Sequence, residues 1–230
     1  MRATIIFLIE LLVIATVFHL DYLGLLPVSK TPYLFLLGWI SIRLRGLRWK
    51  DVGLRFGPEP DWPLTKILVV GFVVGIGMEA LELFASQPLL TKLLHQAPDL
   101  HELQRLVGNT QLLILGIVLA WILAAFGEET VWRGYLLNRL GDLFGKSTFA
   151  WIVVAILTTI LFGLAHFPQG PTGITENIID GAILAAVYVV TGRNLIAPII
   201  AHGIQDTIDV LLIYLGKYPG FSESFASLGH

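Results

Sequence analysis

The chain of 230 residues contains no cysteine, and only 14% of its residues are charged. The absence of cysteine excludes disulfide bonds, thiolate metal sites, a cysteine nucleophile and a lipid anchor carried on cysteine. Soluble domains carry roughly 25% charged residues, so the charged fraction is low for a protein in water. No segment forms a basic surface concentrated enough to predict nucleic acid as a partner, and the net charge is −2.

Hydrophobic residues instead make up 55% of the sequence and give it a mean hydropathy of +0.77. Six tryptophans and 23 glycines also suit membrane helices, which use glycine for close packing and tryptophan at the interfaces. We therefore expect an all-α fold, a polytopic transmembrane helical bundle. It forms one integral-membrane domain over residues 1–230, with a motif core at about 111–215. Such a multi-pass protein lies in the cell membrane if it is prokaryotic.

Apolar runs divide the chain into segments near the length that crosses a bilayer, which is roughly 20 residues for a helix. Region 87–110 is amphipathic, with leucines at helical spacing, and we expect it to form interfacial helices unless it supplies an eighth span. The sequence thus predicts about seven to eight spans. The seven lie at 3–20, 32–44, 64–86, 111–131, 148–166, 175–192 and 195–215.

Basic residues indicate the orientation, because cytoplasmic loops of membrane proteins carry an excess of lysine and arginine. Five of them crowd the connection between the second and third spans: Arg43, Arg45, Arg48, Lys50 and Arg55. We therefore expect residues 43–55 to be cytoplasmic. If the ionisable side chains described next form a polar cavity, we expect that cavity to open toward the same leaflet.

Several ionisable side chains interrupt otherwise apolar segments. The run 111–127 has no charge, yet two acids and an arginine follow it directly, and two histidines and a third acid occur in later apolar segments. Ionisable groups at membrane depth cost several kcal/mol and seldom persist without a function. The set suggests hydrolytic chemistry inside the membrane: Glu128, Glu129, Arg133, His166, His202 and Asp206.

Helical spacing indicates which of these side chains meet. Glu129 and Arg133 are i,i+4 neighbours and can form an ion pair, while Glu128 points about 100° away and can face a different cavity. The same spacing recurs twice later in the chain, in two further pairs. In the pair Phe162–His166 the phenyl ring lies beside the imidazole. In the pair His202–Asp206 the acid can orient the imidazole or share its proton.

Each feature also has a purely structural interpretation. Taken alone, Glu129 and Arg133 are more typical of a structural ion pair, and His166 of a histidine at the membrane interface. Taken alone, His202 and Asp206 are equally consistent with a structural polar pair and with a site. What favours a site is their conjunction, since all of them together in membrane segments require a shared polar cavity.

Other features are given structural interpretations only. Glu79 and Glu82 are interpreted as the end of the third span, and Glu10 and Asp180 are assigned no chemistry. Pro198 predicts a kink in the last span. Gly71 and Gly75 fit a close helix–helix contact.

The three ordered motifs resemble the signature of the CAAX prenyl protease type II family, also called the CPBP or Abi family. They read Glu128-Glu129-x-x-x-Arg133, then Phe162-x-x-x-His166, then His202-x-x-x-Asp206. The resemblance covers residues 125–210 well and the N-terminal half only in hydropathy. It implies an intramembrane endopeptidase surrounded by membrane lipids, with a membrane-tethered peptide or prenylated protein as substrate.

The resemblance also implies roles for the residues. Glu128 would be the general base, His166 would help to hold the water, and Glu129 with Arg133 would be a supporting pair. His202 and Asp206 would stabilise the oxyanion or complete the polar cage. The family motif often ends in asparagine, whose amide can donate a hydrogen bond to an oxyanion, whereas an ionised aspartate cannot. The favoured role of Asp206 is therefore to orient His202.

A metal ion and two other functions remain as alternatives. Glu128, His166 and His202 could bind zinc with an open position, but the pattern H-E-x-x-H is absent and we favour a metal-free site. A non-catalytic scaffold or bacteriocin self-immunity protein is a second interpretation, against which the intact ionisable residues argue. A proton-coupled transporter is a third, less favoured because no internal repeat is visible.

Overall fold

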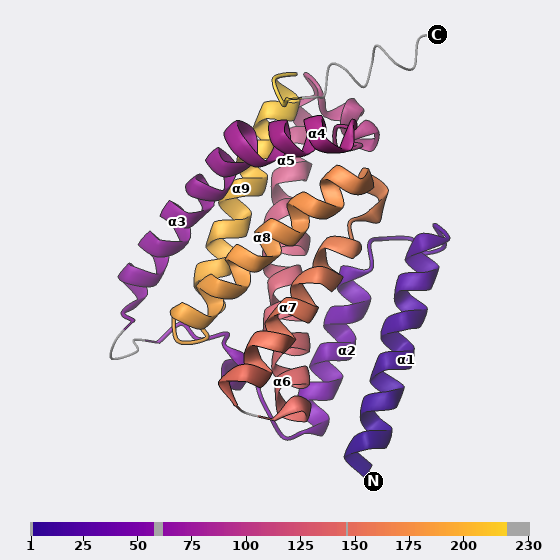
Figure 1. The fold of residues 1–230 in the computed structure, drawn as a ribbon, viewed down its shortest axis with the longest axis vertical. Coiled ribbons are helices and arrows are strands. Elements are labelled where there is room, and N and C mark those ends of the chain that lie inside the picture. Colours follow the sequence, from indigo (N-terminus) through magenta and orange to yellow (C-terminus); the bar gives the residue numbers. More distant parts are fainter. Residues whose placement is uncertain (1, 58–61, 146, 220–230) are drawn as a thin grey trace.

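The computed structural model describes residues 2–57, 62–145 and 147–219, so parts of the predicted 1–230 domain lie outside the described residues (Figure 1). The described residues contain helices and no strand, which confirms the all-α prediction. In chain order the elements are α1 (Arg2–Tyr22), α2 (Thr31–Leu44), the 3₁₀ helix η1 (Trp49–Val52), α3 (Leu64–Leu81), the π-helix η2 (Glu82–Ser86), α4 (Gln87–Leu94), the 3₁₀ helix η3 (His101–Leu106), α5 (Thr110–Leu119), the π-helices η4 (Ala120–Glu128) and η5 (Thr130–Leu137), α6 (Asn138–Phe144), α7 (Thr148–Leu164), the 3₁₀ helix η6 (Phe167–Gln169), α8 (Gly170–Val190) and α9 (Ile196–Tyr214).

Five helical segments are long and apolar enough to cross a membrane, and α7 is a shorter apolar helix of 17 residues. Large apolar side chains cover the outside of the bundle, among them Leu12, Phe72 and Phe149. A soluble monomer rarely exposes so much contiguous apolar surface, whereas lipid tails solvate it. The protein is therefore an integral membrane protein.

Region 87–110 does not supply an eighth span. Its first eight residues form α4, which continues α3 through the π-helix η2 and lies at an angle to it (Figure 1). After α4 the region holds only the six-residue η3 before α5 begins. The third span therefore reaches past its predicted end at 86, as part of a helical segment over Leu64–Leu94.

The fourth span is also longer than its apolar run. The helical segment Thr110–Phe144 has 35 residues, and beyond the apolar run every residue of η5 is buried. Glu128 therefore lies near the middle of this segment. The helix continues beyond the predicted end of the span at 131, through η5 and α6.

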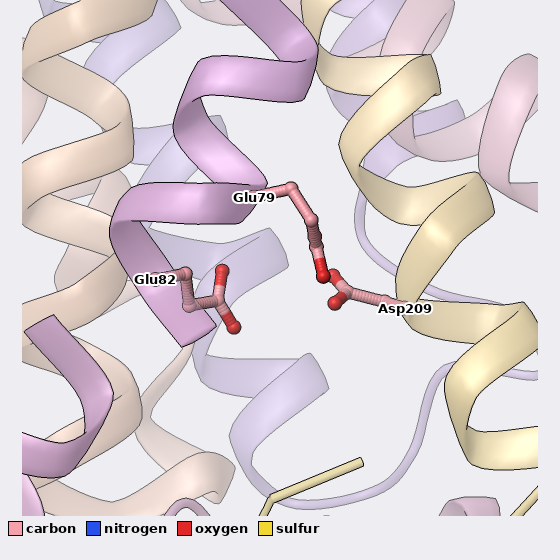
Figure 2. Close-up of side chains that lie close together, drawn as sticks. All are labelled: Glu79, Glu82 and Asp209. Carbon is pink, nitrogen blue, oxygen red and sulfur yellow. The ribbon is translucent and has the colours of Figure 1, made fainter. Parts of the chain in front are cut away.

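Helices α3 and α9 run parallel in close contact, as the two glycines predicted. A Cβ built on Gly71 would lie 2.7 Å from the carbonyl oxygen of Ala197, and one on Gly75 would lie 2.6 Å from that of Ala201. Both contacts advance by four residues, so the register continues toward the C-terminal ends of the two helices. Glu79 lies one turn after Gly75, and its carboxylate faces that of Asp209 on α9 (Figure 2).

Pro198 does not kink the last span. Helix α9 begins at Ile196, so the proline lies in its first turn, where the missing N–H would have had no helical partner. The backbone N–H of Ile196 is instead satisfied by the side-chain oxygen of Asn194, at 2.9 Å. The predicted kink assumed a proline inside the helix, whereas this proline is the third residue of α9, at a position where helices accept it.

Candidate active site

A cavity of about 770 Å³ opens among α5, η4, α8, α9 and the η3 segment. Leucines of α5 and η4 form one wall: Leu112, Leu115, Leu119 and Leu123. The other walls carry seven acids but only one arginine and two histidines: Glu82, Glu102, Glu128, Glu176, Asp180, Asp206 and Asp209, with Arg105, His166 and His202. An apolar wall thus faces an acidic one in the same space.

The cavity opens at the end of the bundle opposite residues 43–55. Arg55 donates to the carbonyl oxygen of Gly192 at 2.6 Å, so this connection packs against the turn between α8 and α9. Residues 98–106 line the cavity and are anchored at the other ends of these helices, where Asp99 N–H donates to the carbonyl oxygen of Gln169 at 2.9 Å. The predicted opening toward the 43–55 side is wrong. The prediction assumed that the fourth span ends near 131, whereas the helix continues to Phe144.

Glu128 and His166 face each other across part of the cavity, with Oε2 and Nε2 3.9 Å apart. The other ring nitrogen of His166, Nδ1, lies 2.9 Å from the carbonyl oxygen of Phe162. A carbonyl oxygen can only accept, so Nδ1 carries the hydrogen and Nε2 of the neutral ring is an acceptor. The carboxylate oxygen has no donor among the described residues either. Two acceptors therefore converge with no donor between them.

Glu129 joins the other two motifs. Its carboxylate is 0% exposed, and Oε1 accepts from Arg133 Nη1 at 2.7 Å and from His202 Nδ1 at 3.0 Å. The predicted Glu129–Arg133 ion pair is thus present. Arg133 also donates from Nη2 to the carbonyl oxygen of Gly181 on α8, at 3.0 Å. The result is a chain of contacts that fixes the His202 ring from its Nδ1 side.

His202 directs its second nitrogen, Nε2, toward Asp206, whose Oδ1 lies 3.5 Å away. This distance is longer than a normal N–H···O hydrogen bond, so Asp206 is near the ring without fixing it. Both side chains line the cavity. The stronger orienting contact of His202 is the one with Glu129, a partner that its own helix does not contain.

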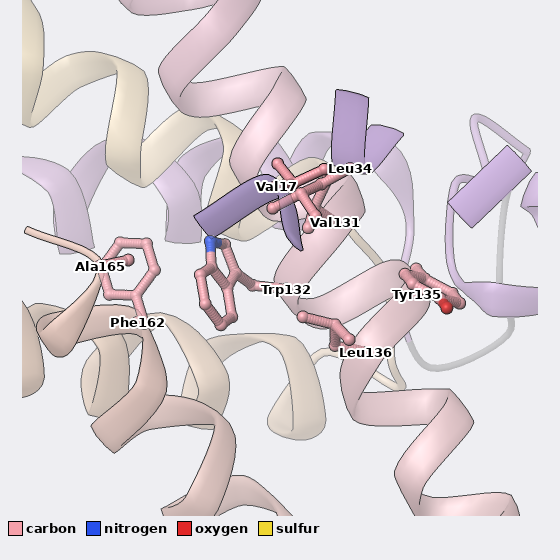
Figure 3. Close-up of a cluster of buried hydrophobic side chains, with 8 residues drawn as sticks. All are labelled: Val17, Leu34, Val131, Trp132, Tyr135, Leu136, Phe162 and Ala165. Atoms are coloured by element: carbon pink, nitrogen blue, oxygen red, sulfur yellow. The ribbon is translucent and has the colours of Figure 1, made fainter. Parts of the chain in front are cut away.

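Phe162 packs between the motifs. Its ring lies 4.9 Å from the His166 ring and 6.3 Å from the His202 ring, and the Arg133 guanidinium lies 4.6 Å above it. The predicted contact of Phe162 with His166 is therefore present. The ring belongs to a buried cluster drawn from α1, α2, η5 and α7 (Figure 3), whose members are Val17, Leu34, Val131, Trp132, Tyr135, Leu136, Phe162 and Ala165.

Acids that the sequence analysis did not assign to the site also line the cavity. Gln205 donates to Glu82 at 2.7 Å and to Asp180 at 3.2 Å, which ties η2, α8 and α9 together. Glu82 was interpreted as the end of a span, and that interpretation is wrong because it lies buried inside a continuous helical segment. Asp180, which was given no chemistry, lines the cavity. The sequence did indicate that Glu82 and Asp180 could belong to a site, because each is an acid within an apolar stretch.

The mouth of the cavity carries an exposed pair outside the spans. His101 Nδ1 lies 2.8 Å from Asp99 Oδ1, which also accepts from the backbone N–H of His101. The hydrogen bond and charge of Asp99 raise the pKa of His101 above its ordinary value of 6.5. The backbone N–H of His101 in turn lowers the pKa of Asp99. The pair fixes the start of η3, whose other residues line the cavity.

The predicted zinc ligands do not form a compact donor set. Glu128, His166 and His202 are not gathered within 4.8 Å of one another among the described residues, and both Nδ1 atoms already have partners. One other group in the described residues meets that criterion, and it consists of Glu79, Glu82 and Asp209.

Comparison with protein families matches residues 110–208 to the type II CAAX prenyl endopeptidase Rce1-like family. Over these residues the chain is similar to that family. The predicted resemblance is confirmed, and the matched region contains all seven residues of the three motifs. No curated protein and no solved structure matches the chain. The Rce1-like region supplies α5 through most of α9, and the remaining wall of the cavity comes from outside it.

Proposed function

We propose that the protein is an intramembrane endopeptidase that hydrolyses a peptide bond in a membrane-tethered, CAAX-type prenylated substrate. The observation that supports this best is the convergence of Glu128 Oε2 and His166 Nε2 at 3.9 Å. A group that satisfies two acceptors must carry two hydrogens, and water does so. Water is also the nucleophile that peptide hydrolysis requires.

In the proposed reaction, Glu128 takes a proton from this water while the oxygen attacks the carbonyl carbon of the scissile bond. His166 Nε2 accepts the second hydrogen of the water and so fixes the direction of attack. When the tetrahedral intermediate collapses, the C–N bond breaks and the proton held by Glu128 passes to the leaving amine. General acid–base help of this kind contributes about 10²–10⁴-fold to a rate.

His202 is the proposed donor to the oxyanion. Its Nδ1–H donates to Glu129, so a proton on Nε2 makes the ring cationic, and the carboxylates of Glu129 and Asp206 balance that charge. The Nε2–H lies in the cavity without a close hydrogen bond to Asp206, so it can donate to the developing oxyanion, where a preorganised donor is most effective. Arg133 acts through Glu129 and is a positioning residue.

The cavity supports a substrate with a lipid part. Its leucine wall on α5 and η4 offers apolar surface next to the polar groups, so a chain of CH₂ or prenyl units and a peptide can occupy the same space. This arrangement favours a tethered peptide over a scaffold function, which requires no converging acceptors. It also favours hydrolysis over proton transport, for which the matched family gives no support.

We further propose that the reaction is metal-free, since the three predicted zinc ligands form no compact donor set. Activity should then persist after treatment with a chelator and dialysis. Loss of activity on chelation, with recovery when zinc is added back, would overturn this part of the proposal.

The decisive experiment compares wild-type protein with Glu128→Gln on a fluorogenic farnesylated peptide in detergent or nanodiscs. Glutamine keeps the shape of the side chain but cannot accept the proton, so kcat should fall by about 10²–10⁴-fold while the melting temperature stays close to that of wild type. The same peptide without the lipid should be cleaved more slowly by wild type.

The matched control is Asp142→Asn, which removes an acid outside the cavity that forms an exposed ion pair with Arg45. Exposed pairs contribute little to stability, so this variant should cleave like wild type. If Glu128→Gln turned over the peptide as fast as the control, Glu128 would not be the base.

A further inference from the structure

A second cluster of acids lies at the end of the cavity away from Glu128. It consists of Glu79 on α3, Glu82 at the start of η2 and Asp209 on α9, with one oxygen of each within 4.8 Å of the others. In Figure 2 Glu79 points across to Asp209, and Glu82 comes from the next turn of the same helical segment. None of the three forms an ion pair with a basic side chain in the described part of the chain.

Glu79 is the most informative member. It is 4% exposed, its carboxylate is aimed at Asp209, and neither of its oxygens has a hydrogen-bond donor outside the cluster among the described residues. Oδ1 of Asp209 also has no donor. Burial of carboxylates without compensation is costly, and three within contact distance repel one another as well. The cluster therefore requires a positive partner or shared protons.

Each carboxylate oxygen of Glu82 accepts a hydrogen bond, as those of a carboxylate that binds a metal ion commonly do. Gln205 donates to its Oε2 at 2.7 Å, and the hydroxyl of Tyr218 donates to its Oε1. Each oxygen of Glu82 keeps a further lone pair for a ligand. Outer-shell donors of this kind fix the direction of a ligating carboxylate and are part of most metal sites.

We propose that Glu79, Glu82 and Asp209 bind a hard divalent cation. All the donors are oxygens, which suit Ca²⁺, Mg²⁺ and Mn²⁺ rather than the metals that prefer nitrogen or sulfur. Two oxygens bound to one Ca²⁺ can lie at most about 4.6–5.2 Å apart, twice its bond length, and the three donors lie within 4.8 Å of one another, so one ion can reach all of them. Glu82 and Asp209 line the cavity, through which the ion and its water ligands can enter.

The cation would clamp α3 and η2 to α9. Asp209 lies three residues after Asp206, so the clamp would act one turn from the pair formed by His202 and Asp206. The site is separate from the proposed water-activating residues, and its existence does not depend on the protease proposal.

The test measures Mn²⁺ bound by the purified, chelator-stripped protein, by electron paramagnetic resonance, with Ca²⁺ as competitor. Wild type should bind one Mn²⁺ that Ca²⁺ displaces. Glu79→Gln and Asp209→Asn should each weaken binding by about tenfold or more, since even outer-shell changes cost this much. Glu176→Gln, a buried acid of the same cavity outside the cluster, should bind as wild type does.

Two further measurements show whether the ion is bound at the acidic cluster or at the proposed catalytic residues. Glu128→Gln should leave Mn²⁺ binding unchanged, because binding at the proposed catalytic residues would be lost in that variant. Ca²⁺ should raise the melting temperature of wild type but not of Glu79→Gln. Absence of bound Mn²⁺ and Ca²⁺ at millimolar concentration, which would mean that Glu79 and Asp209 share a proton, would overturn the proposal. Equal binding by wild type and Glu79→Gln would do the same.

Discussion

Among the single residues of the candidate site, Glu129 links the first motif to the last one, because it contacts both Arg133 and His202. A single oxygen accepts from Arg133 and from His202, and the side chain is completely buried. Removal of Arg133 would therefore leave a buried carboxylate without its cation and His202 without a fixed orienting partner. The proposed positioning role of Arg133 follows from this shared oxygen.

The corresponding prediction concerns Arg133→Ala. The substitution should destabilise the protein by about 3–5 kcal/mol, the usual cost of breaking a buried pair by removing one partner. It should also reduce peptide cleavage at a temperature at which the variant is still folded, because His202 is no longer held. Thermal unfolding in detergent and the fluorogenic assay measure the two effects.

Arg139→Ala provides the matched control. Arg139 forms another buried ion pair, with Glu10 at 2.7 Å, and neither residue lines the cavity. This variant should lose a similar amount of stability but keep its activity below its melting temperature. An Arg133→Ala protein with the melting temperature of wild type would contradict the stability prediction, and equal activities of the two variants would contradict the positioning role.

Spacing in the sequence was sufficient for contacts within one helix. Glu129–Arg133 and Phe162–His166 are separated by one turn, and helix geometry alone places their side chains together. The hydrogen bond between Glu129 and His202 spans 73 positions and depends on how η4 packs against α9. No periodicity in the sequence carries that information, so the sequence analysis assigned the orientation of His202 to Asp206 instead.

At the scale of helices, the sequence predicted where they occur better than where they end. The apolar runs stop near 86 and 131, but the helical segments continue to Leu94 and Phe144. The second extension carries buried polar side chains, among them Arg133 and Arg139, so hydropathy underestimates its length. The π-helices were not predicted either, because their i→i+5 bonds follow from packing and have no simple sequence pattern.

The contact of α3 with α9 leads to a prediction at this scale. Gly75→Ala should destabilise the protein by about 1–3 kcal/mol, because the new methyl group would meet the Ala201 carbonyl oxygen at 2.6 Å and the Ile204 Cβ at 2.8 Å. Backbone positions must shift to relieve such contacts. Unfolding in detergent by heat or denaturant measures the loss.

Gly77→Ala is the control for this experiment. Gly77 lies on the same helix, and a Cβ there would have no atom within 4 Å. Alanine is the better helix former by about 1 kcal/mol, so this variant should be as stable as wild type or slightly more so. Similar losses from both substitutions would mean that helix propensity, and not the close contact, sets the effect.

At the scale of the whole molecule, the seven motif residues meet, although they come from segments far apart in the chain. Glu128 lies in the middle of a long helical segment, and His166 directly follows the short helix α7. Because α7 ends at Leu164, His166 lies in the wall of the cavity, with its Nε2 3.9 Å from Glu128 Oε2. The resulting cavity opens at the end opposite residues 43–55.

The last prediction joins this geometry to the orientation in the membrane. Arginines and lysines concentrated in 43–55 predict that this connection is cytoplasmic, and the cavity must then open toward the other side. The chain has no cysteine, so single cysteines can be introduced without a background. In intact cells an impermeant maleimide should label Glu102→Cys, exposed at the mouth of the cavity, and not Arg48→Cys, exposed at the opposite end. The reverse pattern would place the cavity on the cytoplasmic side, where the substrate would have to be tethered to the inner leaflet.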